Sequence, residues 1–155
     1  PDTSRLGQVL FDTMGRYGDD PRLERLWCEP LPDGTYRLYS LPCITWRLAP
    51  DDVLGASVKD GQLQFTERLR SGGHGVIWFY LPENTTREQW EPWLQRFKAL
   101  GCVMDRFGPD WYGADCPSGA VYEQAFRLAE EWCTAVPGAL FDTPATPNGS
   151  NLVMR

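Results

Sequence analysis

The front part of the chain carries the pattern of antiparallel β-strands. Residues 62–65 alternate polar and apolar side chains, and Asp60-Gly61 just before them is a strong hairpin signal. The runs 26–31 and 35–41 flank Pro32-Asp33-Gly34, in which proline fixes φ and glycine accepts a positive φ. These patterns predict two successive hairpins and therefore a strand-rich front half.

A continuous apolar run from Val76 to Leu81 opens the back part of the chain. Such a run is typical of a central strand that is covered on both faces. Apolar residues at spacings of three and four then predict two amphipathic helices. The first helix begins at the capping box Thr86–Gln89 and ends at Gly101. The second helix is capped by Ser118 and stops at Pro137-Gly138.

Two short strands, 102–107 and 111–116, are predicted between the helices. Pro92 lies past the first turn of the first helix, so we expect the helix to begin nearer Gln89 or to kink at this proline. The order of elements from Val76 onward is β-α-β-β-α. This is the ferredoxin-like pattern without its last strand, which a strand from earlier in the chain could supply.

The sequence therefore predicts an α+β fold. An N-terminal antiparallel, β-rich and barrel-like half packs with a ferredoxin-like half. Residues 24–142 form the single domain, and residues 1–23 form a docked arm or a short strand. Residues 143–155 are rich in Thr, Pro and Asn and are expected to form a flexible tail.

Length and charge narrow the class of protein. The chain has 155 residues, which is enough for one domain. Its net charge of −6 disfavours nucleic acid and membrane surfaces as partners, because both carry negative charge. The five cysteines are odd in number and contain no C-x-x-C pair, which argues against a disulfide framework and a zinc site. Together with the lack of an apolar run of about 18 residues and of a signal-peptide pattern, this predicts a cytoplasmic protein.

His74 is the single histidine and lies in the glycine-rich stretch Gly72–Gly75. Asp115 and Cys116 end another predicted strand, so a Cys-His-Asp constellation would form if the two strands were neighbours. The simpler interpretation is structural: His74 bonds the loop backbone, Asp115 caps the turn before Pro117, and Cys116 is buried. A phosphate-binding loop is disfavoured because a strand, not a helix, follows the glycines. No metal set or cofactor is predicted.

The aromatic content of 13% offers anchors for surface recognition. Together with acidic side chains, some of these rings would contact a protein partner; the candidates are Trp90, Trp93, Trp111, Tyr112, Asp51 and Asp52. The alternative is that all the rings are buried against the faces of the sheet, because side chains of this size are usually largely buried.

Several stretches, in order, resemble the bacterial domain-of-unknown-function family 4265. They are E-R-L-W-C-E-P-L at 24–31 with Y-R-L at 36–38, then R-S-G-G-H-G at 70–75, then G-A-D-C-P at 113–117. Residues 41–43 and 51–53 match further family segments in part. The loop departs from the family pattern by an extra glycine and by Gly75 and Val76 where Ser and Thr are usual, so any chemistry of those hydroxyls would be absent here. The resemblance covers roughly residues 24 to 135.

The resemblance implies a bacterial cytoplasmic protein, often a small stand-alone chain, and it implies no particular reaction. Acidic chains of this kind are common among immunity-type proteins that neutralise a toxin. The leading hypothesis is therefore a non-catalytic binding protein, immunity-like or regulatory, with a protein partner. The alternatives are a small hydrolase or transferase that uses His74 with Cys116 or Asp115, and a small-ligand module with a pocket between the barrel and the helices. The sequence makes no prediction of oligomeric state.

Overall fold

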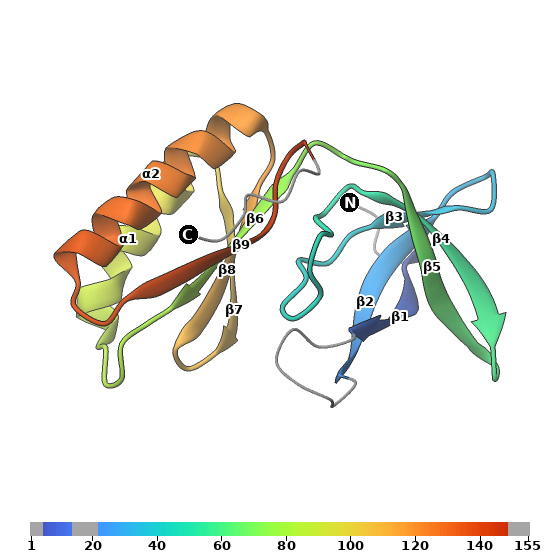
Figure 1. Cartoon of the computed structure of the whole chain (residues 1–155), viewed down its shortest axis with the longest axis horizontal. Coiled ribbons are helices and arrows are strands. Elements are labelled where there is room, and N and C mark those ends of the chain that lie inside the picture. The colour runs from blue at the N-terminus through green and yellow to red at the C-terminus, as the bar shows by residue number, and fades with distance from the viewer. Residues whose placement is uncertain (1–4, 14–21, 149–155) are drawn as a thin grey trace.

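The computed structural model describes residues 5–13 and 22–148. These residues form two sheets that lie side by side, with both helices on the second sheet (Figure 1). The front half consists of strands β1 to β5: Gly7–Thr13, Arg22–Pro30, Tyr36–Leu38, Val53–Lys59 and Gln62–Arg70. The back half consists of β6 (Gly75–Tyr80), α1 (Arg87–Ala99), β7 (Val103–Gly108), β8 (Trp111–Cys116), α2 (Gly119–Ala135) and β9 (Leu140–Ala145). The predicted α+β class is confirmed.

The front sheet has the strand order β1-β2-β3-β4-β5, with antiparallel pairing between neighbours. One parallel pair, Leu10 with Gln64, also joins β1 to β5. The side chains of β2 alternate, so that Leu26 and Cys28 are buried while Leu23 and Trp27 are exposed. The inner residues pack into one core cluster: Val9, Leu26, Cys28, Leu38, Leu48 and Leu54.

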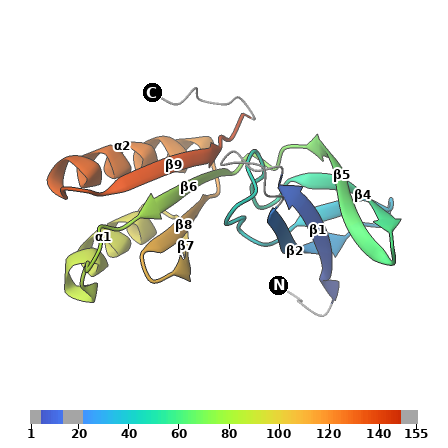
Figure 2. The same ribbon diagram turned by 60° about the horizontal axis from the view of Figure 1, so that its bottom comes forward.

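The back sheet has the order β7-β8-β6-β9, and every neighbouring pair is antiparallel. Both helices cover the same face, on the side away from the front half (Figures 1 and 2). Ile77 and Phe79 of β6 pack with the helices, and Val76 and Trp78 pack on the opposite face against residues between β3 and β4. The prediction of a central strand covered on both faces is therefore confirmed for β6.

The strand that completes the back sheet is β9, and it comes from the end of the described chain. The sequence prediction that an earlier strand would fill this place is wrong. So is the expectation of a flexible tail from residue 143, because β9 continues to Ala145; residues 149–155 lie outside the described residues. Pro144 is compatible with this strand because β9 is at the edge of the sheet, where a missing N–H donor breaks no ladder.

The predicted N-terminal arm contributes a full strand. β1 pairs along its length with β2, so this part of residues 1–23 belongs to the front sheet. Residues 1–4 and 14–21 of the arm lie outside the described residues. Neither helix in the described part of the chain has the length and apolarity that crossing a membrane requires.

Helix α1 begins where its capping box places it. The Thr86 hydroxyl accepts the Gln89 N–H at 3.3 Å, and the Gln89 side-chain oxygen accepts the Thr86 N–H at 2.8 Å. The helix runs from Arg87 through Pro92, so the alternative start nearer Gln89 is wrong. The two hydrogen bonds of the capping box offset the intrahelical hydrogen bond that Pro92, which has no N–H, does not make.

The front core gives a matched test of the fold. Leu54 of β4 is fully buried, whereas Leu69 of β5 is half exposed. Leu54→Ala should lower the free energy of unfolding by about 2–5 kcal/mol, because it leaves a cavity in the core. Leu69→Ala should change it by no more than about 0.5 kcal/mol. Urea denaturation measures both, and equal losses in the two variants would contradict this arrangement of β4 and β5.

Candidate functional site

The segment between β3 and β4, residues 39–52, packs between the two halves and is called the junction loop here. Two adjacent residues of this loop pack into different clusters: Leu48 packs with the front core, and Ala49 packs with Val76 and Trp78 of the back sheet. The Trp78 indole N–H also donates to the Pro42 carbonyl at 2.9 Å. The junction loop therefore packs against both halves of the molecule.

Glu24 of β2 holds the first part of the junction loop. Its carboxylate accepts the backbone N–H groups of Cys43, Ile44 and Thr45 at 2.7, 3.2 and 2.8 Å, and the Thr45 hydroxyl donates to it as well. The side chain is buried. A buried carboxylate with four donors is a structural group, because its lone pairs are occupied by the chain itself.

Asp52 holds the other end of the junction loop. It is 1% exposed, and its two oxygens accept the N–H groups of Gly72 and Ala49 at 2.9 and 3.0 Å. The Arg68 guanidinium lies 3.9 Å away. Burial raises the pKa of Asp52, and these two N–H groups and Arg68 oppose that rise. The sequence prediction placed Asp52 on a binding surface, and its burial rules that role out.

The glycine-rich stretch packs closely on this turn. A Cβ atom at Gly72 would lie 2.5 Å from the backbone carbonyl of Asp51, so only glycine fits there. A Cβ atom at Gly75 would lie 2.3 Å from the ring of Tyr122 on α2. The glycines thus permit close packing between the junction loop, the connection to β6 and helix α2.

His74 lies between two carboxylates. Its Nδ1 is 2.7 Å from Asp115 Oδ1, and its Nε2 is 3.6 Å from Asp51 Oδ2. The hydrogen bond to Asp115 is the main cause that raises the pKa of His74; burial opposes it, and the charges of Asp115, Asp51 and Asp52 add to it. The structure therefore brings His74 and Asp115 together, as the constellation hypothesis requires.

Cys116 does not join this pair. Successive residues of a strand point to opposite faces, and Cys116 is buried in the cluster on the helix side. Its sulfur lies 3.8 Å from that of Cys102, and this contact together with burial raises the pKa of its thiol. A protonated thiol in the core is not a nucleophile, so the Cys-His-Asp form of the hypothesis is wrong.

A groove of about 590 Å³ lies between strands β2 and β7, and Glu24, Arg25 and Leu26 of β2 line it. Both strands lie on the facing sides of the two halves (Figure 1). The junction loop contributes Leu41, Cys43 and Pro50 to its lining, and β8 contributes Asp115. Asp115 therefore has two contacts: its carboxylate is hydrogen-bonded to His74, and its side chain lines the groove.

Large apolar side chains are exposed at and beside this groove. Tyr39 and Val103 line it and are 47% and 63% exposed. Leu23 and Trp27, 60% and 45% exposed, lie on the same outward side of β2 as the groove residue Arg25. Trp27 and Tyr39 were not among the binding residues predicted from the sequence. The alternation of β2 could have indicated Trp27, because Leu26 and Cys28 on either side of it point inward.

The predicted aromatic anchors lie mostly within the molecule. Trp90 is 3% exposed and packs against Trp132 in the core, so its predicted part in a binding surface is wrong. Tyr112 packs on Trp90, and Trp93 is partly buried with the Arg96 guanidinium 4.7 Å from its ring. Trp111 stacks on Tyr80 on the other face of the sheet and is partly buried. Of the predicted acidic residues, Asp51 is exposed.

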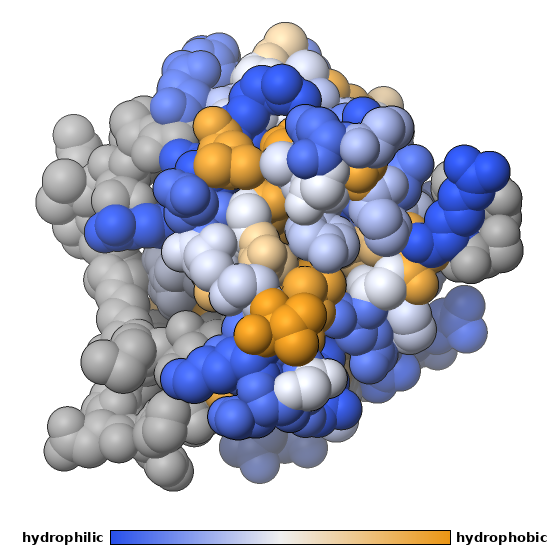
Figure 3. Space-filling model, turned by 90° about the vertical axis from the view of Figure 1, so that its right-hand side faces the viewer, coloured by the Kyte–Doolittle hydropathy of each residue, from blue (hydrophilic) through white to orange (hydrophobic). Residues whose placement is uncertain are grey.

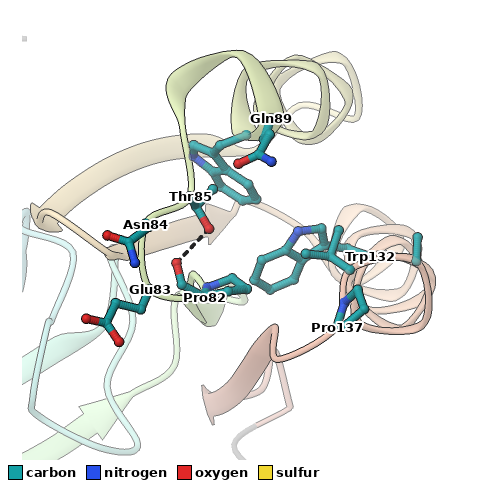
Figure 4. Close-up of a pocket in the computed structure, with 10 residues that line it drawn as sticks. Pro82, Glu83, Asn84, Thr85, Gln89, Trp132 and Pro137 are labelled. Carbon is teal, nitrogen blue, oxygen red and sulfur yellow. Dashed lines mark hydrogen bonds between the residues drawn. The ribbon is translucent and has the colours of Figure 1, made fainter.

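A second hollow, of about 470 Å³, lies between the turn at Pro82–Thr85 and the ends of the two helices (Figure 4). The Thr85 hydroxyl donates to the Pro82 carbonyl at 2.6 Å, and the Gln89 side chain serves the helix cap. These polar groups are thus engaged within the turn and the cap. The small-ligand hypothesis placed its pocket between the barrel and the helices, and this hollow lies elsewhere. Within the described chain, no group of three or more His, Cys, Asp or Glu residues is placed to hold a metal ion.

Glu24 provides a matched test of how the junction loop is held. In Glu24→Gln an amide N–H₂ replaces one acceptor and faces backbone donors, so a buried donor loses its partner. The variant should lose about 1–3 kcal/mol of unfolding free energy. Glu29→Gln, on the same strand, removes only an exposed ion pair with Arg37 and should lose no more than about 0.5 kcal/mol. Denaturant unfolding of the two variants compares them, and a Glu24→Gln variant as stable as Glu29→Gln would contradict the assignment.

The His74 cluster predicts a pH dependence of stability. Because the pKa of His74 is raised in the folded chain, the stabilisation is fully present below the ordinary histidine pKa and is lost as pH rises through the raised value. The difference in unfolding free energy between the natural chain and His74→Gln should therefore shrink from slightly acidic to alkaline pH. Thermal and urea unfolding across this range measure the difference. A gap that widens with pH would show that the folded state favours the neutral ring.

Comparison with known proteins supports the fold and the family. No curated protein sequence matches the chain. The structure is similar to that of a hypothetical protein from Neisseria gonorrhoeae, with a TM-score of 0.78 and 13% sequence identity, over 90% of this chain and 94% of that chain. At this identity the similarity concerns the fold alone. The family model described as domain of unknown function (DUF4265) matches residues 24–131, which hold Glu24, the junction loop, His74 and Asp115, and the chain therefore belongs to this family.

Proposed function

We propose that the chain is a non-catalytic binding protein that recognises a protein partner at the groove between its halves. The observation that carries the proposal is the set of exposed apolar side chains beside this groove: Leu23, Trp27, Tyr39 and Val103. Aromatic side chains on concave surfaces are the residues that most often anchor protein interfaces. An immunity-like or regulatory role in the bacterial cytoplasm is the most concrete form of the proposal. The five free cysteines support a reducing compartment.

The end of the front half that carries the β4–β5 hairpin offers less for such a contact. On this face, hydrophobic side chains are separated by hydrophilic ones (Figure 3). Val58, at 74% exposure, is the large apolar residue next to the hairpin turn. Single exposed apolar residues of this kind are normal on soluble proteins. Val58 therefore serves as a control position for the groove.

The charges of the groove favour one kind of partner. Asp105 and Asp115 lie on its back wall and Arg25 lies on its front wall. The chain as a whole carries a net charge of −6. A partner with an apolar side chain to place beside Tyr39, flanked by basic side chains that face Asp105, would complement both the shape and the charge.

The finer form of the fold is also a proposal. We infer that the back half is ferredoxin-like, supported by its order β-α-β-β-α-β, its strand order β7-β8-β6-β9 and the two helices on one face. We infer that the front half is barrel-like, supported by the pairing of β1 with both β2 and β5. The groove would then lie between a barrel wall and the helix-free face of the back sheet.

A small hydrolase or transferase that uses His74 is the second candidate, and the 2.7 Å contact with Asp115 favours it. An aspartate that orients a histidine is a common catalytic arrangement. Here, however, the second ring nitrogen lies 3.6 Å from the Asp51 carboxylate, so both nitrogens of the ring already face carboxylates of the chain itself. A general base must have a ring nitrogen within hydrogen-bond reach of the substrate, and here both nitrogens face carboxylates of the chain, so the geometry supports binding better than catalysis.

The binding proposal is tested with a captured partner and matched variants. The natural chain serves as bait in a lysate of its own bacterium, and the captured protein is identified, purified and titrated by calorimetry. Trp27→Ala and Tyr39→Ala should each raise Kd by at least about 10-fold, because anchors of this kind contribute more than 1 kcal/mol. Val58→Ala should leave Kd within about 2-fold.

Three outcomes would contradict the proposal. One is that no protein is captured. Another is that Val58→Ala weakens binding as much as the groove variants. The third is that the natural chain turns over a substrate and His74→Gln abolishes the turnover, which would favour the catalytic alternative.

A further inference from the structure

His74 occupies the connection between the two halves of the molecule. It lies between the end of β5 at Arg70 and the start of β6 at Gly75. One ring nitrogen contacts Asp115 on the back sheet, and the other faces Asp51 on the junction loop. We propose that His74 is a proton-controlled latch that holds the junction loop against the back half.

The two ring nitrogens have different parts in this latch. A neutral imidazole carries one N–H, and a protonated imidazole carries two. The 2.7 Å contact of Nδ1 with Asp115 is a hydrogen bond that the neutral ring can keep by holding its one proton there. The 3.6 Å separation of Nε2 from Asp51 is an ion pair that needs the second proton. Loss of that proton turns a lone pair toward the Asp51 carboxylate, so the Asp51 side of the latch opens.

The conformation of the junction loop at Asp51 depends in part on this attraction. Arg47 and Asp51 have φ angles of 68° and 70°, in the left-handed region that residues with a side chain seldom adopt. Such a conformation persists when surrounding contacts hold it. Around Asp51 those contacts are the His74 ring, the close approach of Gly72, and the hydrogen bonds that the carboxylate of the neighbouring Asp52 accepts from backbone N–H groups.

Other charged and titratable groups face this site from each neighbouring element. Asp52 belongs to the loop, Arg68 to β5, Asp115 to β8, and Tyr122 lies on α2 with its ring against Gly75. Arg68 stays charged over the range in which histidine titrates. Burial raises the pKa of Tyr122 to about 12, so this group stays neutral there. Asp52, whose pKa is raised by burial, titrates both in the natural chain and in His74→Gln, so the proton on His74 is the change that distinguishes the two chains.

The latch has a consequence for binding that rests on the proposed function. Pro50 of the junction loop and Asp115 of β8 both line the groove. Release of Asp51 would alter the groove between them, so partner affinity would depend on the protonation of His74. NMR titration of the chain without a partner tests the latch independently of whether the groove binds a protein.

NMR titration tests the latch directly. The chain has one histidine, so its imidazole gives one set of carbon-bound proton signals. In the natural chain the His74 midpoint should lie above the ordinary histidine pKa of about 6.5, and the amide signals of Ala49, Asp52 and Gly72 should shift with that same midpoint. In Asp51→Asn the midpoint should move to lower pH, and the coupled amide shifts should shrink. Asparagine tolerates a positive φ, so the backbone at this position is preserved.

Asp60→Asn is the matched control, because Asp60 also has a positive φ and lies in the β4–β5 turn. It should leave the His74 midpoint unchanged. The latch is overturned if Asp51→Asn leaves the midpoint where it is in the natural chain. It is also overturned if the three amides titrate with the same midpoint in His74→Gln, since their shifts would then report another group. Should His74→Gln fail to fold, the comparison of Asp51→Asn with Asp60→Asn still decides the question.

Discussion

The arrangement of the molecule depends on buried carboxylates that accept backbone N–H groups of the junction loop. This loop has no strand or helix of its own, so the backbone donors of Cys43, Ile44, Thr45 and Ala49 would otherwise lie unpaired between two sheets. Glu24 serves three of them and Asp52 serves Ala49 and the connecting residue Gly72. Because each net hydrogen bond to a charged group contributes about 1.5–3 kcal/mol, these contacts can hold a loop that local propensity would not. The loop held in this way presents the Pro42 carbonyl and Ala49 to the back sheet.

The same contacts bring together family segments that lie far apart in the sequence. The first segment supplies Glu24, the middle one supplies Gly72 and His74, and the last one supplies Asp115. Each of them reaches the junction loop or a residue bonded to it. The segments that identify the family are thus largely structural, and the groove is the opening that they leave between the halves.

The local parts of the fold could be predicted from the sequence because their signals are local. The Asp60-Gly61 turn, the Thr86 capping box and the doubly covered run at β6 each follow from a few neighbouring residues. Strand β9 could not be found in this way. Its Thr-Pro-Ala composition is that of a loop, and only pairing with β6 makes it a strand.

Part of the candidate site could also be predicted from the sequence. His74 and Asp115 share a surface because β6 and β8 are neighbours, and the sequence hypothesis assumed this pairing. Cys116 was misplaced because strand alternation turns it to the helix side. Trp90 was misplaced because a residue in the first turn of a helix was expected to be exposed, whereas three core rings surround it.

The most direct test of this account is native-state amide hydrogen exchange in the junction loop. Amides in a loop held only by its ends exchange rapidly, as those of an exposed turn do. If the buried carboxylates hold the loop, the amides of Cys43, Thr45, Ala49 and Gly72 should exchange slowly, in the range of the Phe79 amide in the central strand. Exchange of these four amides as fast as that of Gly61, in the exposed β4–β5 turn, would contradict the account.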